Sequence, residues 1–294
     1  MQKLMIVDLN NIAFSVRHSC LGRPKTMRQK EQYAMQKIFN DVLGTILYHA
    51  DKFGRNCLLI ASDSKNVWRK DIYTDYKANH NDDFEDFYYD DVINAIGALE
   101  EFFRDYTAAM VIAVPRCEAD DVIAVWCQNS KNSDNIILST DRDFIQLINE
   151  DTRLYSHVQK EFRTAEDPLF SLFVKCFRGD KSDNIRSAYP KIRETRLEKA
   201  WNDDVEMMNL MNEKLQDGSL VSENFDFNLA LMDLREQPQD IRVKIYNHFV
   251  SYVANKYDEI KAIKFMKNLK LDAFVNVLNK NTVLLRTPLL DCSK

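Results

Sequence analysis

The chain has little glycine and proline, with 6 of each among 294 residues, and no apolar stretch long enough to cross a bilayer. These absences argue against a fibrous protein and against a membrane-spanning one. Its six cysteines are scattered without a C-x-x-C pair, so we predict neither a disulfide framework nor a zinc site. A hydrophobic content of 45% can build a sizeable core, and the length predicts one large domain or two unequal ones.

Short unbroken apolar runs are the strongest structural signal in the first half. Each is typical of a strand buried on both faces of a parallel sheet, and they lie at residues 3–7, 57–61, 109–114 and 135–139. Helical patterns separate them, at residues 32–51, 91–106 and 119–128. The alternation predicts an α/β domain with a doubly wound, mainly parallel sheet.

The strand signal fades after about residue 160, and a mainly helical C-terminal region follows. Its predicted helices cover residues 168–177, 205–215, 225–234, 240–257 and 260–269. We therefore divide the chain into a catalytic domain at 1–185 and a helical domain at 186–294. Residues 21–31 are polar and basic, and we predict a loop there. Residues 75–90 lack clean periodicity, and we predict a mobile loop or a short helical flap.

Acidic residues follow the apolar runs, at the edge where open α/β sheets bind ligands. They are Asp8, Asp63, Glu118, Asp120, Asp121, Asp141 and Asp143, and a further pair, Asp180 and Asp183, lies in the segment RGDKSDNI. So many carboxylates in one cleft would repel each other unless cations shared it. Oxygen ligands without cysteine or histidine favour two Mg²⁺ ions, for which Mn²⁺ could substitute. Such a pair is used for in-line attack on a phosphodiester.

Each piece also has a plain structural interpretation. A single aspartate after a strand is usually a turn or N-cap residue, and Asp141 and Asp143 could cap a helix at residues 142–149. Asp180 and Asp183 could belong to an ordinary turn at Gly179, and Asp121 could be a solvated helix residue. Only their coincidence favours a metal site. Neutralising nine carboxylates would take the net charge from −5 to +4, a sign compatible with a polyanionic partner.

The motifs, taken in order, resemble a known family. They are DLN at Asp8, SDSKNVWR at Asp63, DYKAN at Lys77, EADDVIA at Glu118, STDRDFIQL at Asp141 and RGDKSDNI at Asp180. This set resembles the PIN-like 5′-nuclease superfamily of flap endonucleases, and within it the RNase H branch of the T-even phages. The motifs cover about residues 3–190.

The resemblance implies a role for each matching residue. Asp8, Asp63, Glu118 and Asp120 would hold the first metal, Asp141, Asp143, Asp180 and Asp183 would hold or surround the second, and Asp121 would lie in the outer shell. Lys77, and by similarity Tyr76 and Arg69, would meet the scissile phosphate and an unpaired base beneath a flexible arch at about residues 75–95. Without the resemblance, Lys77 is more simply a surface lysine.

One departure from the family lies after Asp183. Relatives carry a glycine-rich helical hairpin of the GVxGIGxKTA type, which grips the duplex and is a candidate K⁺ site. This chain has RSAYPKIRETRLEKAW instead, so we predict that the duplex grip is taken over by side chains and that K⁺ binding is in doubt. The candidate residues are Lys191, Arg193, Arg196 and Lys199.

The predicted function is a Mg²⁺-dependent 5′ to 3′ exonuclease and flap endonuclease. It would act on 5′ ends and flaps of DNA and RNA/DNA duplexes, leave 5′ phosphates, and remove RNA primers during Okazaki fragment processing. We expect a monomer in the cytoplasm, of the host cell if the chain is phage-encoded, with no membrane contact and with single-strand-binding protein and a sliding clamp as family-type partners.

Two other functions remain open at this point. A haloacid-dehalogenase-like phosphatase also begins with an Asp at a strand end, but it needs a second Asp where this chain has Asn10. That scheme also leaves Asp141 and Asp143 without a role. A noncatalytic nucleic-acid-binding module would keep the fold without the chemistry.

Overall fold

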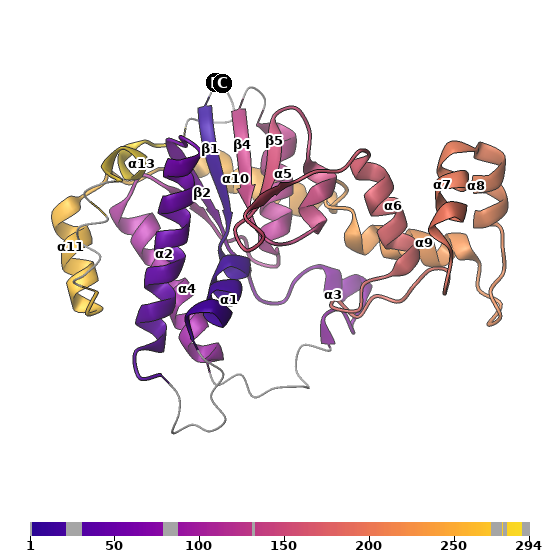
Figure 1. Cartoon of the computed structure of the whole chain (residues 1–294), viewed down its shortest axis with the longest axis horizontal. Helices are drawn as coiled ribbons and strands as arrows, with labels where there is room; N and C mark the ends of the chain where they lie inside the picture. The colour runs from indigo at the N-terminus through magenta and orange to yellow at the C-terminus, as the bar shows by residue number, and fades with distance from the viewer. Residues whose placement is uncertain are drawn as a thin grey trace.

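The computed structural model describes residues 2–21, 31–78, 88–130, 133–271, 278 and 281–289. Its centre is a six-stranded sheet in the order β3-β2-β1-β4-β5-β6 (Figure 1). All neighbouring strands are parallel except β6, which runs antiparallel to β5. The strands are β1 (Gln2–Asp8), β2 (Cys57–Ala61), β3 (Met110–Ile112), β4 (Ser133–Leu138), β5 (Thr152–Ser156) and β6 (Glu161–Arg163).

The four strands predicted from apolar runs are confirmed as β1 to β4. The strands β5 and β6 were not predicted. Arg153 interrupts the apolar character of β5 by pointing to solvent, and β6 has only three residues. An edge hairpin of this kind is specified by pairing with β4 more than by its own sequence pattern.

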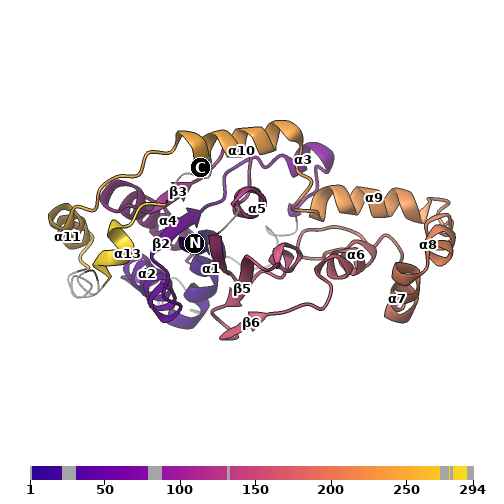
Figure 2. The same cartoon turned by 90° about the horizontal axis from the view of Figure 1, so that it is seen from above.

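Helices cover both faces of the sheet, as the doubly wound prediction requires (Figure 2). Alternate residues of β1 enter the two cores: Met5 and Val7 lie in the first, Leu4 and Ile6 in the second. The first core includes α1 (Leu9–Cys20), α2 (Ala34–Lys52) and α4 (Tyr89–Tyr106), and the second includes α5 (Ala119–Asn129) and α10 (Gln239–Ser251). The helix α1 was not predicted.

A third apolar cluster builds a helical lobe beside the sheet, on the right of Figure 1. It packs α6 (Pro168–Arg178), α7 (Glu194–Asn202), α8 (Asp204–Met211) and α9 (Val221–Met232). The rings of Phe173 and Phe177 both pack on Phe225, with centroids 5.6 and 4.9 Å apart. Tyr76 from the α/β part joins this cluster, so the lobe is attached beside the carboxyl ends of the strands.

The last helices return to the sheet. The helix α10 packs in the second core, and side chains of α11 (Glu259–Asn268) and α13 (Thr282–Arg286) pack in the first. The prediction of one helix over residues 240–257 is wrong at its end, because α10 ends at Ser251. The next residue leaves the helix to anchor β3: the Tyr252 hydroxyl accepts from Val111 N at 3.2 Å and donates to Ala109 O at 2.8 Å.

The structure describes only part of the predicted arch at residues 75–95. Residues 79–87 lie outside the described residues, and residues 89–95 form the first turns of α4. Most of the loop predicted at 21–31 also lies outside them. None of the described helices is long and apolar enough to span a membrane.

Candidate metal centre

The carboxyl ends of the parallel strands bring the predicted acids together. Asp8 is the last residue of β1 and pairs in register with Ala61 of β2, so Asp63 follows at the same edge. On the other side, Val7 pairs with Leu138 at the end of β4. The Ser139 hydroxyl joins these two halves, because it donates to Asp8 Oδ2 at 2.8 Å and accepts from Asp141 N at 3.1 Å.

Two asparagines at the start of α1 fix the neighbouring loops. Asn10 Oδ1 accepts from the backbone N–H of Asp63 at 3.2 Å. Asn11 Oδ1 accepts from both the backbone N–H and the hydroxyl of Thr140, each at 2.9 Å. The loops after β2 and β4, which carry two of the predicted ligands, are thus tied to the helix that follows the third, Asp8.

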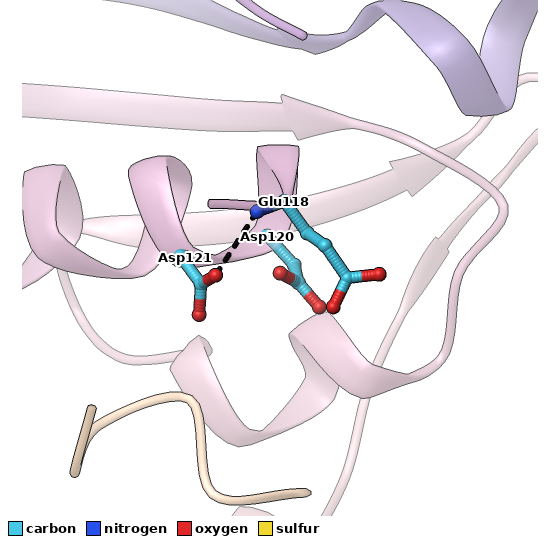
Figure 3. Close-up of side chains that lie close together, drawn as sticks. All are labelled: Glu118, Asp120 and Asp121. Atoms are coloured by element: carbon cyan, nitrogen blue, oxygen red, sulfur yellow. Dashed lines mark hydrogen bonds between the residues drawn. The ribbon is translucent and has the colours of Figure 1, made fainter. Parts of the chain in front are cut away.

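The EADD segment forms the entry turn of α5. Glu118 is its N-cap residue, and Glu118, Asp120 and Asp121 can each offer an oxygen within 4.8 Å of the others. Figure 3 shows that the carboxylates of Glu118 and Asp120 lie side by side, whereas Asp121 turns back toward the backbone N–H of Glu118. The entry turn therefore produces the convergence that a regular helix could not.

Asp121 has a different task from its two neighbours. It is fully buried, and its Oδ2 accepts from Glu118 N at 3.0 Å, Trp68 Nε1 at 3.0 Å and Arg69 at 3.1 Å. Its other oxygen lies 2.9 Å from Arg69. Asp120 Oδ1 is also buried, accepts no hydrogen bond from any described residue, and lies 3.6 Å from Arg69 Nη1. Asp120 is thus held less tightly by its neighbours than Asp121, which anchors the turn.

Arg69 lies beneath the site rather than in it. It begins α3 (Arg69–Ile72), and its side chain is 1% exposed. The guanidinium pairs with Glu118 Oε2 at 2.8 Å and with Asp121, while Nε donates to Leu231 O at 2.8 Å. These contacts leave Arg69 no access to a substrate phosphate, so its geometry favours a positioning role over the direct contact that we predicted.

Lys77 and Tyr76 bridge two groups of carboxylates. Lys77 Nζ lies 2.5 Å from Glu118 Oε1 and 3.9 Å from Asp183 Oδ1, and the side chain is 35% exposed. The buried Tyr76 hydroxyl donates to Glu118 at 3.1 Å and to Asp183 at 3.3 Å. Lys77 has a φ of 55°, and its backbone N–H donates to Asp183 O at 3.0 Å. The resulting bridge makes the two acidic clusters one continuous site.

The second cluster consists of Asp143, Asp180 and Asp183, whose oxygens can also lie within 4.8 Å of one another. Asp143 begins the short helix η3 (Asp143–Leu147), and the two other aspartates lie in the turn after α6. That turn requires Gly179, which has a φ of 73°. A Cβ there would lie 2.5 Å from the backbone of both Ile185 and Arg186.

Lys175, which the sequence analysis missed, contacts this cluster. Its ammonium pairs with Asp143 Oδ1 and lies 2.7 Å from Asp180 Oδ2. A signal was present, since this lysine lies within the apolar sequence FVKCF of α6. Ser139, Asn10 and Asn11 were also missed as supporting residues, although Asn10 lies in the DLN motif and Ser139 in the STDRDFIQL motif.

The pKa values of four carboxylates in the site indicate a shortage of positive charge around them. Burial, together with the charge of Asp63, raises the pKa of Asp8 from 3.8 to about 7. Burial and the neighbouring Asp143 raise the pKa of Asp141 to about 6. Burial also raises the pKa of Asp63, and raises that of Asp120 well above its ordinary value. Additional positive charge at the site would therefore favour the ionised form of these carboxylates.

The pKa values of Glu118 and Asp180 show the effect of the side-chain cations beside them. Burial acts to raise the pKa of Glu118, but the charges of Lys77 and Arg69 outweigh it and the pKa is lowered. Burial likewise opposes ionisation of Asp180, yet contacts with Lys175 and Ser182 lower its pKa to about 2. The all-oxygen donor set, the buried Asp120 oxygen that accepts no hydrogen bond and the raised pKa values together fit hard divalent cations such as Mg²⁺.

The four residues predicted to grip a duplex lie in the helical lobe. Two of them form ion pairs there: Arg196 pairs with Glu213, and Lys199 Nζ lies 2.5 Å from Glu206. Lys191 and Arg193 are exposed and form no ion pair with the described residues. Of the four, these two remain available for a phosphate backbone, and the role of all four stays a prediction.

Comparison with known proteins agrees with this geometry. Residues 3–171 match the family model described as "5'-3' exonuclease, N-terminal resolvase-like domain". DNA polymerase I of Chloroflexus aurantiacus is 30% identical over 207 residues, covering 62% of this chain and 20% of that protein. The flap endonuclease Xni of Pseudoalteromonas translucida is 27% identical over 133 residues, covering 42% of this chain and 49% of the relative. The chain thus spans less than half the length of each of these relatives.

Among solved structures, the chain is similar to the bacteriophage T5 flap endonuclease in a pseudo-enzyme–product complex with DNA and metal ions. The TM-score is 0.63 and the identity 17%, over 92% of this chain and 99% of the T5 chain. This likeness confirms the predicted fold class. The family model covers more than half of the residues and includes the acids of β1, β2, α5 and η3. The chain therefore belongs to the 5′-3′ exonuclease family, within the 5′-nuclease superfamily of metal-dependent hydrolases.

Proposed function

We propose that this chain is a 5′ to 3′ exonuclease and flap endonuclease that hydrolyses phosphodiesters near 5′ ends of DNA and RNA/DNA duplexes and leaves 5′ phosphates. One observation carries the proposal. Carboxylates from the ends of β1, β2, β4 and α5 meet those of the RGDKSDNI turn in one site, and Lys77 lies between the two groups. The named relatives include DNA polymerase I and a flap endonuclease, which supports a role in RNA primer removal during replication.

The residues that would hold metal are Glu118 and Asp120 with Asp8 and Asp63, and Asp143, Asp180 and Asp183 with Asp141. When bound there, two Mg²⁺ ions, or Mn²⁺ in their place, supply an activated water and stabilise the leaving oxygen. Asp121 stays outside the ligand set because its oxygens are engaged by Arg69, Trp68 and Glu118 N.

Among the cationic side chains of the first cluster, Lys77 is the one that can reach a substrate. Its half-exposed ammonium can bind the scissile phosphate and stabilise negative charge that develops on it. Tyr76 and Arg69 hold Glu118 from the buried side. We infer that they position the carboxylate for catalysis, and that contact of Tyr76 with an unpaired base would require its side chain to leave Glu118.

The helical lobe is the proposed duplex-binding part. It lies next to the second cluster and presents Lys191 and Arg193 to solvent. The division at residue 186 and partners such as a clamp or single-strand-binding protein remain proposals. A phosphatase of the haloacid-dehalogenase type is disfavoured, because Asn10, at the position where that scheme needs an acid, uses its amide oxygen to accept from Asp63 N.

The test uses a 5′-labelled flap duplex and an RNA/DNA hybrid, incubated with protein in Mg²⁺ or in EDTA. We expect short 5′-phosphorylated products in Mg²⁺ only, and none from Asp141→Asn. Asp151→Asn is the matched control, because Asp151 is an exposed turn residue before β5. Cleavage that ignores EDTA, or that Asp141→Asn performs at the full rate, would refute the proposal. A folded wild-type protein that binds DNA without cutting it would support the noncatalytic alternative.

A further inference from the structure

Lys175 occupies the second acidic cluster in a way that the proposed catalytic roles do not explain. It projects from α6, its side chain is 25% exposed, and its ammonium contacts Asp143 Oδ1 and Asp180 Oδ2 together. These are two of the three carboxylates whose oxygens come close enough to hold one cation. A lysine ammonium is a compact cation with three donors, so it can satisfy the same oxygens that a metal would use.

The oxygens of Asp180 and Asp183 in this cluster are engaged by other groups as well. Asp180 Oδ1 accepts from the backbone N–H of Ser182 at 2.8 Å and from its hydroxyl. Asp183 Oδ2 accepts from Tyr76, and its Oδ1 lies 3.9 Å from Lys77 Nζ. Both oxygens of Asp180 therefore have an internal contact. Oδ2, which Lys175 binds, is the more easily released, because Oδ1 is fixed by the turn.

We propose that Lys175 is a resident counter-cation of the second cluster and competes with a divalent metal for Asp143 and Asp180. The inference rests on the proposed metal-dependent function. A divalent ion can take Asp143 Oδ1 and Asp180 Oδ2 only when the ammonium moves away, which makes the second site weaker than its carboxylates alone would be. The lysine in return keeps the cluster assembled in the metal-free protein, because it neutralises groups that would otherwise repel each other.

The surroundings provide a place for the displaced side chain. A groove of about 600 Å³ lies between η3 and α6, and Lys175 forms part of its wall together with Thr140, Arg142, Ser171 and Arg178. Burial acts to lower the pKa of Lys175, but Asp143 and Asp180 outweigh it and raise the pKa above its ordinary value. The ammonium stays charged over the working pH range, so the competition is between two cations and does not depend on deprotonation.

The experiment titrates metal-free protein with Mn²⁺ in the absence of nucleic acid and follows free Mn²⁺ by its EPR signal. The variants are Lys175→Met and, as the matched control, Lys181→Met. Lys181 is an exposed lysine in the same turn, so its loss changes the net charge equally without touching the cluster. We expect Lys175→Met to tighten the weaker binding step by about tenfold or more, which corresponds to about 1.4 kcal/mol. Lys181→Met should leave that step unchanged.

Two further variants make the result decisive. Asp143→Asn should abolish the step that Lys175→Met tightens, which assigns it to the second cluster. Lys175→Arg keeps the charge and should bind Mn²⁺ like the wild type, which also guards against a folding defect in Lys175→Met. In EDTA, Lys175→Met should melt at a lower temperature and gain more from added Mn²⁺.

An unchanged or weaker second step in a folded Lys175→Met protein would overturn the inference, since the lysine would then only hold the carboxylates in place. Because no DNA is present, this outcome is independent of whether the protein cleaves nucleic acid.

Discussion

Replacing Arg69 by methionine should destabilise the fold far more than its single charge suggests. The guanidinium lies within 2.9 Å of carboxylate oxygens of both Glu118 and Asp121, and Nε donates to Leu231 O. The side chain is 1% exposed, and the two acids are 8% and 0% exposed. Methionine fills similar volume but leaves Asp121 buried without a counter-charge and leaves Glu118 with Lys77 alone.

The expected loss follows from the cost of an uncompensated buried charge. Breaking a buried ion pair from one side costs about 3–5 kcal/mol, whereas an exposed pair is worth about 0–1 kcal/mol. Arg116→Met is the matched control, because Arg116 pairs with Asp71 nearby with side chains that are 46% and 69% exposed. We therefore expect Arg69→Met to cost at least about 3 kcal/mol and Arg116→Met less than about 1 kcal/mol.

The assay is urea denaturation at pH 7 in EDTA, followed by circular dichroism, with the slope m compared across variants. The double variant Arg69→Met with Asp121→Asn should recover part of the loss, because it removes one of the stranded charges. If Arg69→Met unfolds within about 1 kcal/mol of the wild type, like the exposed control, the network around Glu118 contributes no more than a surface pair. The reasoning would then be refuted.

Three further predictions concern single side chains. The pKa of Asp8 is raised from 3.8 to about 7, so the folded state keeps a proton that the unfolded state releases. In EDTA, the free energy of unfolding of the wild type should therefore fall relative to that of Asp8→Asn as the pH rises from about 4 to about 7. Urea titrations should show a difference of up to about 4 kcal/mol. Gly179→Ala should cost more than Gly218→Ala, although both have positive φ, because only the first Cβ meets backbone within 4 Å; thermal melts compare them. Asp120→Asn should weaken Mn²⁺ binding, measured by calorimetry, without lowering the free energy of unfolding. Asp121→Asn should lower the free energy of unfolding by about 2 kcal/mol or more, measured by denaturation.

The parts of the fold that could be predicted are those specified by local pattern. The apolar runs of β1 to β4 are buried on both faces, and such runs have few alternatives. The acids after them could be placed because parallel strands end at one edge, a rule of topology that needs no contact information. Asp8, Asp63 and Asp141 were found in this way.

The missed elements depend on partners distant in the sequence. The helix α1 does carry buried residues at helical spacing, Leu9, Ile12, Ala13 and Val16, but the polar residues between them conceal the signal. The end of α10 is set by the bonds of Tyr252 to Val111 of β3 and to Ala109. The strand β5 is set by its register with β4. Contacts of this kind arise from the tertiary structure and leave no periodic pattern.

The charges of the site show where reasoning from the sequence must stop. Nine carboxylates in one cleft require cations, and from sequence alone all of that compensation was assigned to metal. The structure assigns part of it to three side chains, Arg69, Lys77 and Lys175, none of which is a sequence neighbour of the acids that it contacts. These three cations leave six negative charges, and two divalent ions would bring four. Before metal binds, the raised pKa values of Asp8 and Asp120 favour the protonated form of these two carboxyl groups. Metal binding should therefore release protons from this site, and a fall in pH on adding Mn²⁺ to weakly buffered protein would measure how many.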